Sequence, residues 1–219
     1  MTHILEADGI QLSFYERKIL SGIYLKCETG KITGLLGRNG QGKSCLLKIM
    51  FGSLPAEKSI RFDRISIVTP FKHPELVRYL PQHHFIPGSL SIKRVFKDFD
   101  LDFTKFYHAF PDMKARETSL IGSLSGGERR LIEVYTIAKS TTRFILLDEP
   151  FTQLSPLQIE KLKILLHEEK ENKGLLVTDH MYQHILDISD SLYVLSNGRT
   201  HLTKNISDIE QYGYLKTRS

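Results

Sequence analysis

The chain has 219 residues, 41% of them hydrophobic and 25% charged, a composition that excludes disordered and fibrous classes and allows a sizeable core. No apolar run approaches the roughly 18 residues of a membrane span, and Glu6 interrupts the first residues before a signal peptide can form. The net charge of +5 is scattered, which favours a solvated surface over a nucleic-acid partner. The cysteines, Cys27 and Cys45, have neither metal-binding nor disulfide spacing. These features predict a single cytoplasmic domain over residues 1–219.

The first part of the chain predicts strands at residues 10–14 and 23–27, which would form an antiparallel sheet with residues 60–68. Further apolar runs are typical of parallel strands that are covered on both faces of a sheet. These runs are residues 32–36, 77–80, 144–147, 174–178 and 191–195. The pattern therefore predicts an α/β fold with a parallel core and a smaller antiparallel sheet beside it.

A phosphate-binding loop follows the first parallel strand. Its residues, in the pattern G-x-x-x-x-G-K-S, are Gly37-Arg38-Asn39-Gly40-Gln41-Gly42-Lys43-Ser44. In such a loop, the backbone N–H groups and the start of the next helix bind a triphosphate. Lys43 would reach the β- and γ-phosphates, and Ser44 would offer its hydroxyl to Mg²⁺. Cys45 comes next; we include it among the nucleotide contacts, although packing is its favoured role. The loop predicts binding of a nucleoside triphosphate.

The segment at residues 83–123 is rich in aromatic residues separated by Lys and Asp, which predicts short helices. These aromatics are Phe96, Phe99, Phe103, Phe106, Tyr107 and Phe110. We expect most of them to form the core of a helical subdomain, inserted at approximately 83–140, and a minority near Gln82 to contact a partner. His83 and His84 favour a solvated loop over a metal site, because adjacent strand residues cannot face one ion.

The run Leu124-Ser125-Gly126-Gly127-Glu128 precedes a predicted helix at 128–139. The apolar residues of that helix fall on one face at helical spacing. They are Leu131, Val134, Tyr135 and Ala138. Ser-Gly-Gly alone is a weak signal, because it is more often a flexible turn or a helix start.

Two acids end the apolar run at residues 144–150, where Asp148, Glu149 and Pro150 follow the strand. Acids at the carboxyl end of a central parallel strand point into the crevice where open α/β sheets bind ligands. Asp148 is predicted to hold Mg²⁺, and Glu149 to polarise the water that attacks the γ-phosphate. The alternative is a solvated turn after a buried strand.

The last third predicts a helix at residues 155–169, with Ser155 as its N-cap and Pro156 at its first position. Asn197-Gly198 predicts a hairpin between two short strands. Residues 212–219 favour a frayed terminus. The apolar residues at helical spacing in the 155–169 helix are Leu157, Leu162, Leu165 and Leu166.

Taken in this order, the motifs resemble those of the ATP-binding cassette (ABC) transporter ATPases, over nearly the whole chain. The resemblance implies a P-loop NTPase fold with a RecA-like parallel core, an antiparallel β subdomain and an inserted helical subdomain. It assigns the phosphate loop to 37–44, the glutamine loop to Gln82, the signature to 124–128, the magnesium strand to 144–149 and the switch histidine to His180.

The resemblance also implies roles for residues that spacing alone does not assign. The counterpart of Gln82 touches Mg²⁺ and senses the transmembrane partner, and that of His180 contacts the γ-phosphate and the attacking water. An aromatic near the start of a cassette stacks on adenine, and Phe14 is the best match, with Tyr15 as its competitor.

The chain departs from the usual family pattern at two places. It has Thr178-Asp179-His180 where most members have His-Asp, an order that resembles the lipopolysaccharide-export ATPase branch, as does Asp-Glu-Pro-Phe at 148–151. Ser155 stands where most members carry an Asp that connects the two nucleotide sites. This second departure bears on coupling between sites rather than on ATP binding.

The family mechanism implies two cassettes, as a homodimer or heterodimer, arranged head to tail around two ATP molecules. Ser125, Gly126 and Gly127 of one protomer would cover the γ-phosphate held by Lys43 of the other. ATP hydrolysis, with Mg²⁺, would then drive membrane-spanning subunits, which would keep the chain at the inner face of the cell membrane. Two alternatives remain open: a soluble non-transport ABC ATPase of the cofactor-assembly, translation or repair type, and a nucleotide-binding regulator without turnover.

Overall fold

The computed structural model describes residues 1–203, 208–209 and 212 of the chain. Its larger sheet has six strands in the order β10-β9-β3-β8-β7-β6, of which all but β10 run parallel. The predicted parallel strands are confirmed. They are β3 (Ile32–Leu36), β6 (Val77–Leu80), β7 (Phe144–Asp148), β8 (Gly174–Thr178) and β9 (Ser191–Ser196), with β10 (Arg199–Thr203) at the edge.

The antiparallel sheet is confirmed as well, in the order β2-β1-β4-β5. The predicted strand at 60–68 is instead two strands, because Asp63 and Arg64, both with positive φ, form a turn between β4 and β5. The first two strands of the sheet are longer than the predicted 10–14 and 23–27, because each pairs along nearly its whole length with the other. The four strands are β1 (Ile4–Phe14), β2 (Arg17–Glu28), β4 (Glu57–Phe62) and β5 (Ile65–Ser66).

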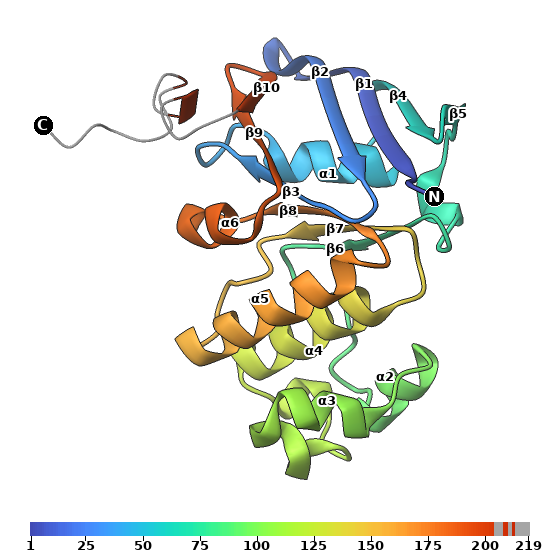
Figure 1. Ribbon diagram of the computed structural model, residues 1–219, viewed down its shortest axis with the longest axis vertical. Coiled ribbons are helices and arrows are strands. Elements are labelled where there is room, and N and C mark those ends of the chain that lie inside the picture. Colours follow the sequence, from blue (N-terminus) through green and yellow to red (C-terminus); the bar gives the residue numbers. More distant parts are fainter. Residues whose placement is uncertain (204–207, 210–211, 213–219) are drawn as a thin grey trace, which may run out of the picture.

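Helices cover both faces of the parallel sheet (Figure 1). Helix α1 (Lys43–Phe51) lies between the two sheets, and α4 (Gly126–Lys139), α5 (Pro156–Lys170) and α6 (Tyr182–Ile188) cover the other face. Successive strand residues point to opposite faces, so Leu147 joins the core under α4 and α5, whereas Leu146 joins the core around α1.

The helical segments of the middle third lie beyond α4 and α5, at the end of the molecule farthest from β10 (Figure 1). The expectation that most aromatic rings are core is confirmed. Phe96, Phe106 and Phe110 are buried, and Phe99 and Phe103 are partly buried against the same core. The Phe106 and Tyr135 ring centroids are 4.8 Å apart. The elements here are α2 (Ile92–Asp98), α3 (Phe103–Ala109), η2 (Pro111–Arg116) and η3 (Ile121–Ser123), whereas η1 (Pro70–Lys72) packs against α1 and β6.

Both predicted helices are present, with one difference in where a helix begins and one in which residues it buries. Ser155 caps α5 and Pro156 is its first residue, as predicted. Helix α4 begins at Gly126, two residues before the predicted start, because the Ser125 side chain accepts the N–H of Glu128. Leu157 was predicted on the apolar face of α5 but is 61% exposed, so that assignment was wrong. It lies in the first turn, where Ile159 is the first residue to pack inward.

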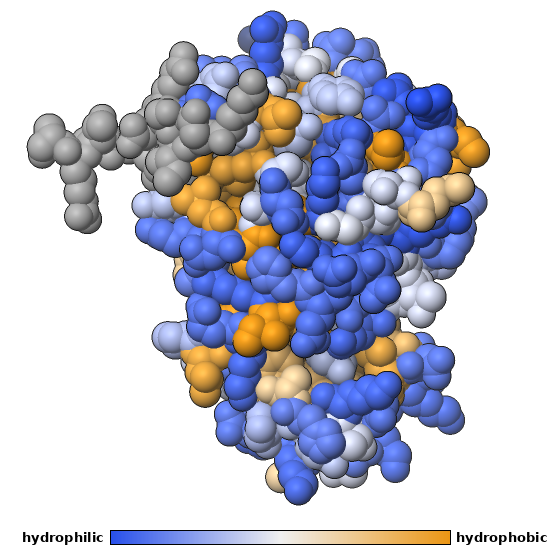
Figure 2. Space-filling model, viewed as in Figure 1, coloured by the Kyte–Doolittle hydropathy of each residue, from blue (hydrophilic) through white to orange (hydrophobic). Residues whose placement is uncertain are grey.

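The Asn197-Gly198 hairpin is confirmed, with positive φ angles at both residues and Ser196 paired with Arg199. Of the expected frayed tail at 212–219, only Tyr212 lies among the described residues. Hydrophilic residues cover most of the face in Figure 2, and apolar residues form separate groups on it. Within the described part of the chain, no helix is both long and apolar enough to cross a membrane.

Candidate active site

A cavity of about 540 Å³ opens at the carboxyl ends of the parallel strands, beside the start of α1. This is the edge at which open α/β sheets bind ligands. Segments far apart in the sequence line this cavity, from Phe14 at the end of β1 to His180 in the turn after β8. The cavity is lined by Phe14, Ile19, Asn39, Gly40, Gly42, Lys43, Ser44, Cys45, Gln82, Glu149 and His180.

The phosphate loop forms one wall of the cavity. Gly42 has a φ of +99°, and a Cβ there would lie 2.8 Å from Ile19 Cγ2, so this position requires glycine. No side chain caps the start of α1, which leaves its first N–H groups free of side-chain partners and suited to a phosphate. The other predicted loop residues, Gly37, Arg38 and Gln41, do not line the cavity.

Lys43 is nearly buried at the base of the loop. Its Nζ donates to the Gly37 carbonyl at 2.7 Å and contacts that of Arg38 at 3.4 Å. Burial lowers the pKa of Lys43, while the nearby carboxylates of Glu149 and Asp148 act to raise it. The ammonium group is thus held beside the cavity by neutral carbonyls, and a phosphate would supply the negative charge that such a group favours.

Asp148 ends β7 and is almost completely buried. Its Oδ1 accepts from Ser44 Oγ at 3.1 Å, and its Oδ2 accepts from Tyr79 OH at 3.0 Å. Burial raises the pKa of Asp148. The paired oxygens of Ser44 and Asp148 are hard ligands of the kind that Mg²⁺ uses together with waters and substrate phosphates. The donor set therefore fits Mg²⁺.

Three predicted catalytic residues meet at one carboxylate. Glu149 Oε2 accepts from Gln82 Nε2 at 3.1 Å and lies 3.4 Å from His180 Nδ1. Thr152 Oγ1 also donates to this oxygen, at 3.4 Å. Because the residues come from the ends of β6, β7 and β8, the parallel order of these strands brings them together.

Sequence analysis did not assign two polar residues of this site. Tyr79 supports Asp148, and only the placement of β6 beside β7 reveals it. Asp179 is buried, and its side chain accepts from the N–H groups of Phe151, at 3.1 Å, and Met181, at 2.9 Å. Burial raises the pKa of Asp179. This carboxylate ties the turn after Glu149 to the turn that carries His180.

The signature residues lie apart from the cavity, since none of Ser125, Gly126 and Gly127 is among its lining residues. Ser125 and Glu128 form a capping box, in which each side chain bonds the backbone N–H of the other. Both glycines pack against Gln153, so that a Cβ on Gly127 would lie 2.5 Å from the Gln153 carbonyl oxygen.

The structure distinguishes the two candidates for adenine stacking. Phe14 lines the cavity and is 46% exposed. Tyr15 is fully exposed and lines a neighbouring surface hollow instead. Phe14, which also borders that hollow, is thus the one of the two aromatics that reaches the cavity.

The solvated-loop interpretation of the two histidines is confirmed, since His83 and His84 are both exposed loop residues, but His84 also makes a contact that the sequence did not indicate. The Nδ1 atom of His84 lies 2.9 Å from the buried Glu133 Oε2, so the ring is tied to α4. Sequence spacing could not indicate this contact, which joins residues 49 positions apart. Within the described part of the chain, no cluster of three or more His, Cys, Asp and Glu residues suits a metal.

The fold, the phosphate loop and the two acids at the end of β7 define a P-loop nucleotide-binding protein. The model of the family described as "ABC transporter" matches residues 20–152, more than half of the chain. The chain therefore belongs to the ABC transporter family, as an ATP-binding subunit with the predicted P-loop NTPase fold.

Relatives agree with this membership. The chain is 28% identical to the lipopolysaccharide export system ATP-binding protein LptB of Acidithiobacillus ferridurans, over 91% of this chain and 89% of LptB. It is 31% identical to a probable ABC transporter ATP-binding protein of Azorhizobium caulinodans, over 89% and 74% of the two chains. The structure of an ATP-binding subunit of an ABC transporter superimposes with a TM-score of 0.80 at 20% identity, covering 96% and 94% of the two chains.

Proposed function

We propose that this chain hydrolyses ATP to drive a membrane transporter. The observation that carries the proposal is the convergence of Gln82, Glu149 and His180 in one cavity with Lys43. A general base must lie within hydrogen-bond reach of the water it activates, and Glu149 faces the cavity next to the phosphate loop. Phosphate transfer needs mainly positioning and charge stabilisation, which this set of residues can supply.

Each residue of the cavity would have a distinct role. Lys43 and the first N–H groups of α1 would bind the β- and γ-phosphates, and Phe14 would stack on adenine. Ser44 and Asp148 would hold Mg²⁺, with Gln82 near it, and the ion would supply charge neutralisation on the phosphates. Glu149 would polarise the attacking water.

His180 and Gln82 would complete the water-binding side of the cavity. Their nitrogen atoms both face Glu149 Oε2. In this arrangement Gln82 would sense the membrane-spanning subunits, which we propose dock on the segment at 83–123 that directly follows it. The domain would be one unit over 1–219, with the helical subdomain at about 83–140 inserted into it.

The signature residues would act on a second copy or on a second, different cassette. Ser125, Gly126 and Gly127 lie outside the cavity of their own chain and present an exposed helix start. In a head-to-tail dimer they would cover the γ-phosphate bound by the other protomer. Loss of the γ-phosphate on hydrolysis would open the dimer and move the attached subunits.

The transport role favours a position on the inner face of the cell membrane, held there by the partner subunits. Relatives named as transporter ATP-binding proteins support this proposal over a soluble non-transport ATPase. Two measurements test it. The purified chain should release phosphate from ATP only with Mg²⁺, and the tagged chain should co-purify from detergent-solubilised membranes with a polytopic protein. A chain recovered only free of membranes would contradict the transport role.

A further inference from the structure

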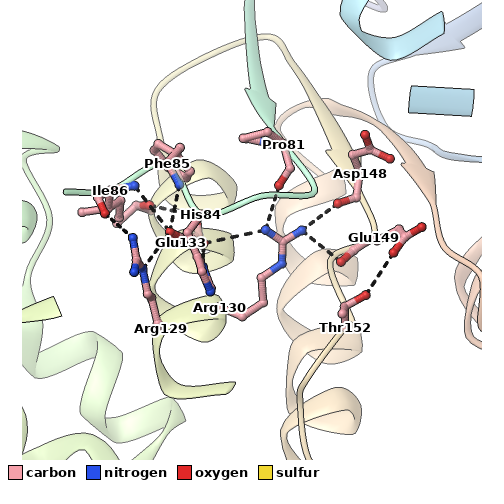
Figure 3. Close-up of polar contacts among 11 residues, drawn as sticks. Pro81, His84, Phe85, Ile86, Arg129, Arg130, Glu133, Asp148, Glu149 and Thr152 are labelled. Carbon is pink, nitrogen blue, oxygen red and sulfur yellow. Dashed lines mark hydrogen bonds and ion pairs between the residues drawn. The ribbon is translucent and has the colours of Figure 1, made fainter. Parts of the chain in front are cut away.

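Helix α4 carries two buried charges in the interior of the molecule. Arg130 is 2% exposed and Glu133, one turn later, is 0% exposed. Buried charges are costly unless they are paired and hydrogen-bonded. The contacts that compensate for this cost therefore indicate what these side chains do, and Figure 3 shows them between α4 and two loops of the site.

The Arg130 guanidinium joins the two loops. Its Nη2 donates to the carbonyl oxygens of Asp148, at 2.6 Å, and Glu149, at 2.9 Å. Its Nη1 donates to the carbonyl of Pro81 at 2.8 Å. One planar, rigid group thus links the peptide just before Gln82 to the two acids at the end of β7 (Figure 3).

Glu133 and Arg129 extend this contact along the segment after Gln82. Glu133 Oε1 accepts from the N–H groups of Phe85, at 3.1 Å, and Ile86, at 3.4 Å, and its Oε2 pairs with His84. Arg129 Nη2 donates to the Ile86 carbonyl at 2.6 Å. Arg129 therefore holds the same segment as Glu133 but, unlike Arg130, has no contact with Asp148 or Glu149 in Figure 3.

The backbone of Glu149 needs support of this kind. Its φ is +53°, in the left-handed region that non-glycine residues rarely adopt and that persists only when surrounding structure holds it. Its N–H donates to the Thr178 carbonyl at 2.8 Å, and its C=O accepts from Arg130. Both peptide groups of the residue are thus fixed, which sets the position from which its side chain extends to Gln82 and Thr152.

We infer that Arg130 is a positioning residue for Glu149, acting through the main chain, and that it links the aim of this carboxylate to the Pro81 peptide directly before Gln82. Arg130 does not line the cavity, so it acts without touching ATP or the attacking water. The inference rests on the proposed role of Glu149 in hydrolysis. It predicts that a small displacement of the Pro81 carbonyl is transmitted to the catalytic carboxylate through the Arg130 guanidinium.

The test compares two substitutions of neighbouring residues in the full chain, Arg130→Lys and Arg129→Lys. A lysine keeps the charge but cannot donate to three carbonyls from a planar fork. Arg130→Lys should lower kcat about tenfold or more and leave KM for ATP within about twofold, since misplacing a catalytic group acts on the chemical step. Arg129→Lys, the matched control, should leave both constants within about twofold.

A second measurement separates positioning from general damage to the fold. In the Glu149→Gln background, Arg130→Lys should cause no further loss of the residual turnover, because a positioning residue has no effect once its target is gone. Parental kcat in Arg130→Lys, or the same fold-loss in both backgrounds, would overturn the inference. If Arg130→Lys does not fold, Arg130→Gln replaces it; failure of both to fold would show a purely structural role and would also overturn it.

The outcomes also separate this inference from the proposed function. A parent chain without turnover, or a Glu149→Gln variant as fast as the parent, refutes the proposed function. Turnover that depends on Glu149 but is unaffected by Arg130→Lys refutes only the role of Arg130.

Discussion

The phosphate-loop region and the signature region differ in how their polar groups are satisfied. At the phosphate loop, the start of α1 has no side-chain cap, and Lys43, Glu149 and His180 face a cavity. At the signature, Ser125 and Glu128 satisfy the start of α4 with a capping box. The first region has the groups to bind a triphosphate by itself. The second is a preformed, exposed surface that suits a ligand held by another molecule, in agreement with the proposed dimer.

The largest effect should come from removing the proposed base on the phosphate-loop side. Glu149→Gln keeps the size of the side chain but lowers its basicity, so turnover should fall about 100-fold or more, while ATP still binds. Phosphate release measures the first effect. With hydrolysis blocked, gel filtration with Mg·ATP should show a shift towards the dimer. Turnover at the parental rate would show that Glu149 is misassigned.

Lys43→Ala should weaken the binding of ATP and not only slow its hydrolysis. It removes a buried ammonium group that we expect to pair with phosphate, and a charged hydrogen bond of this kind corresponds to about a tenfold to hundredfold change in affinity. Titration calorimetry with ATP measures this change. Lys48→Ala, on the same helix but outside the cavity lining, is the matched control and should bind ATP within about twofold of the parent. Equal affinities for the two variants would reject the role of Lys43.

The signature region should respond in the opposite way to Gly127→Ala. A Cβ there would lie 2.5 Å from a backbone oxygen of Gln153, so the start of α4 must shift. ATP affinity of the isolated chain should stay within about twofold, because the cavity is untouched, whereas turnover that needs a dimer should fall about tenfold. Gly126→Ala, whose Cβ would meet only the movable side-chain end of Gln153, should have the smaller effect. Weaker ATP binding by the Gly127 variant would contradict the separation of the two regions.

The sequence indicates the site wherever function depends on local spacing. The phosphate loop, the acids at 148–149 and the cap at Ser155 follow from residues within a few positions of one another, and the elements they define were predicted within a few residues. Gln82 and His180 were assigned through the family resemblance, and the parallel strand order explains why they meet Glu149 at one edge of the sheet.

Contacts between distant segments could not be predicted in this way. Arg130 and Glu133 read as ordinary charges on a helix that was expected to bury one face, yet both are buried, as are Leu131 and Ile132 beside them. Arg130 donates to three main-chain carbonyls and Glu133 accepts from two main-chain N–H groups, and such main-chain partners leave no trace in the sequence. The contact of the exposed loop residue His84 with Glu133 could not be predicted either, because the two residues are 49 positions apart.

The smallest effects concern Ser155, where the two regions would be linked in a dimer. Its Oγ accepts from the N–H of Gln158 at 3.4 Å, and its own N–H donates to Gln158 Oε1 at 2.9 Å. Ser155→Ala should therefore reduce the free energy of unfolding by about 1 kcal/mol, the usual contribution of an N-cap. Ser155→Asp should keep that stability, because Asp caps a helix about as well as Ser. Thermal or denaturant unfolding of the two variants measures the difference.

Cooperativity is the finer test of the same residue. Ser155 directs its polar groups to its own helix, and the N–H groups of Thr152 and Leu154 are bonded within the preceding turn, to the carbonyls of Glu149 and Phe151. The loop therefore offers no carboxylate at this position to connect two sites across a dimer. ATP turnover should accordingly have a Hill coefficient of about 1. Ser155→Asp adds a negative charge without removing the cap and should raise the coefficient. Steady-state turnover of both proteins against ATP concentration, measured with the membrane partner present, decides the matter: strong cooperativity already present with Ser155 would show that backbone groups couple the sites unaided.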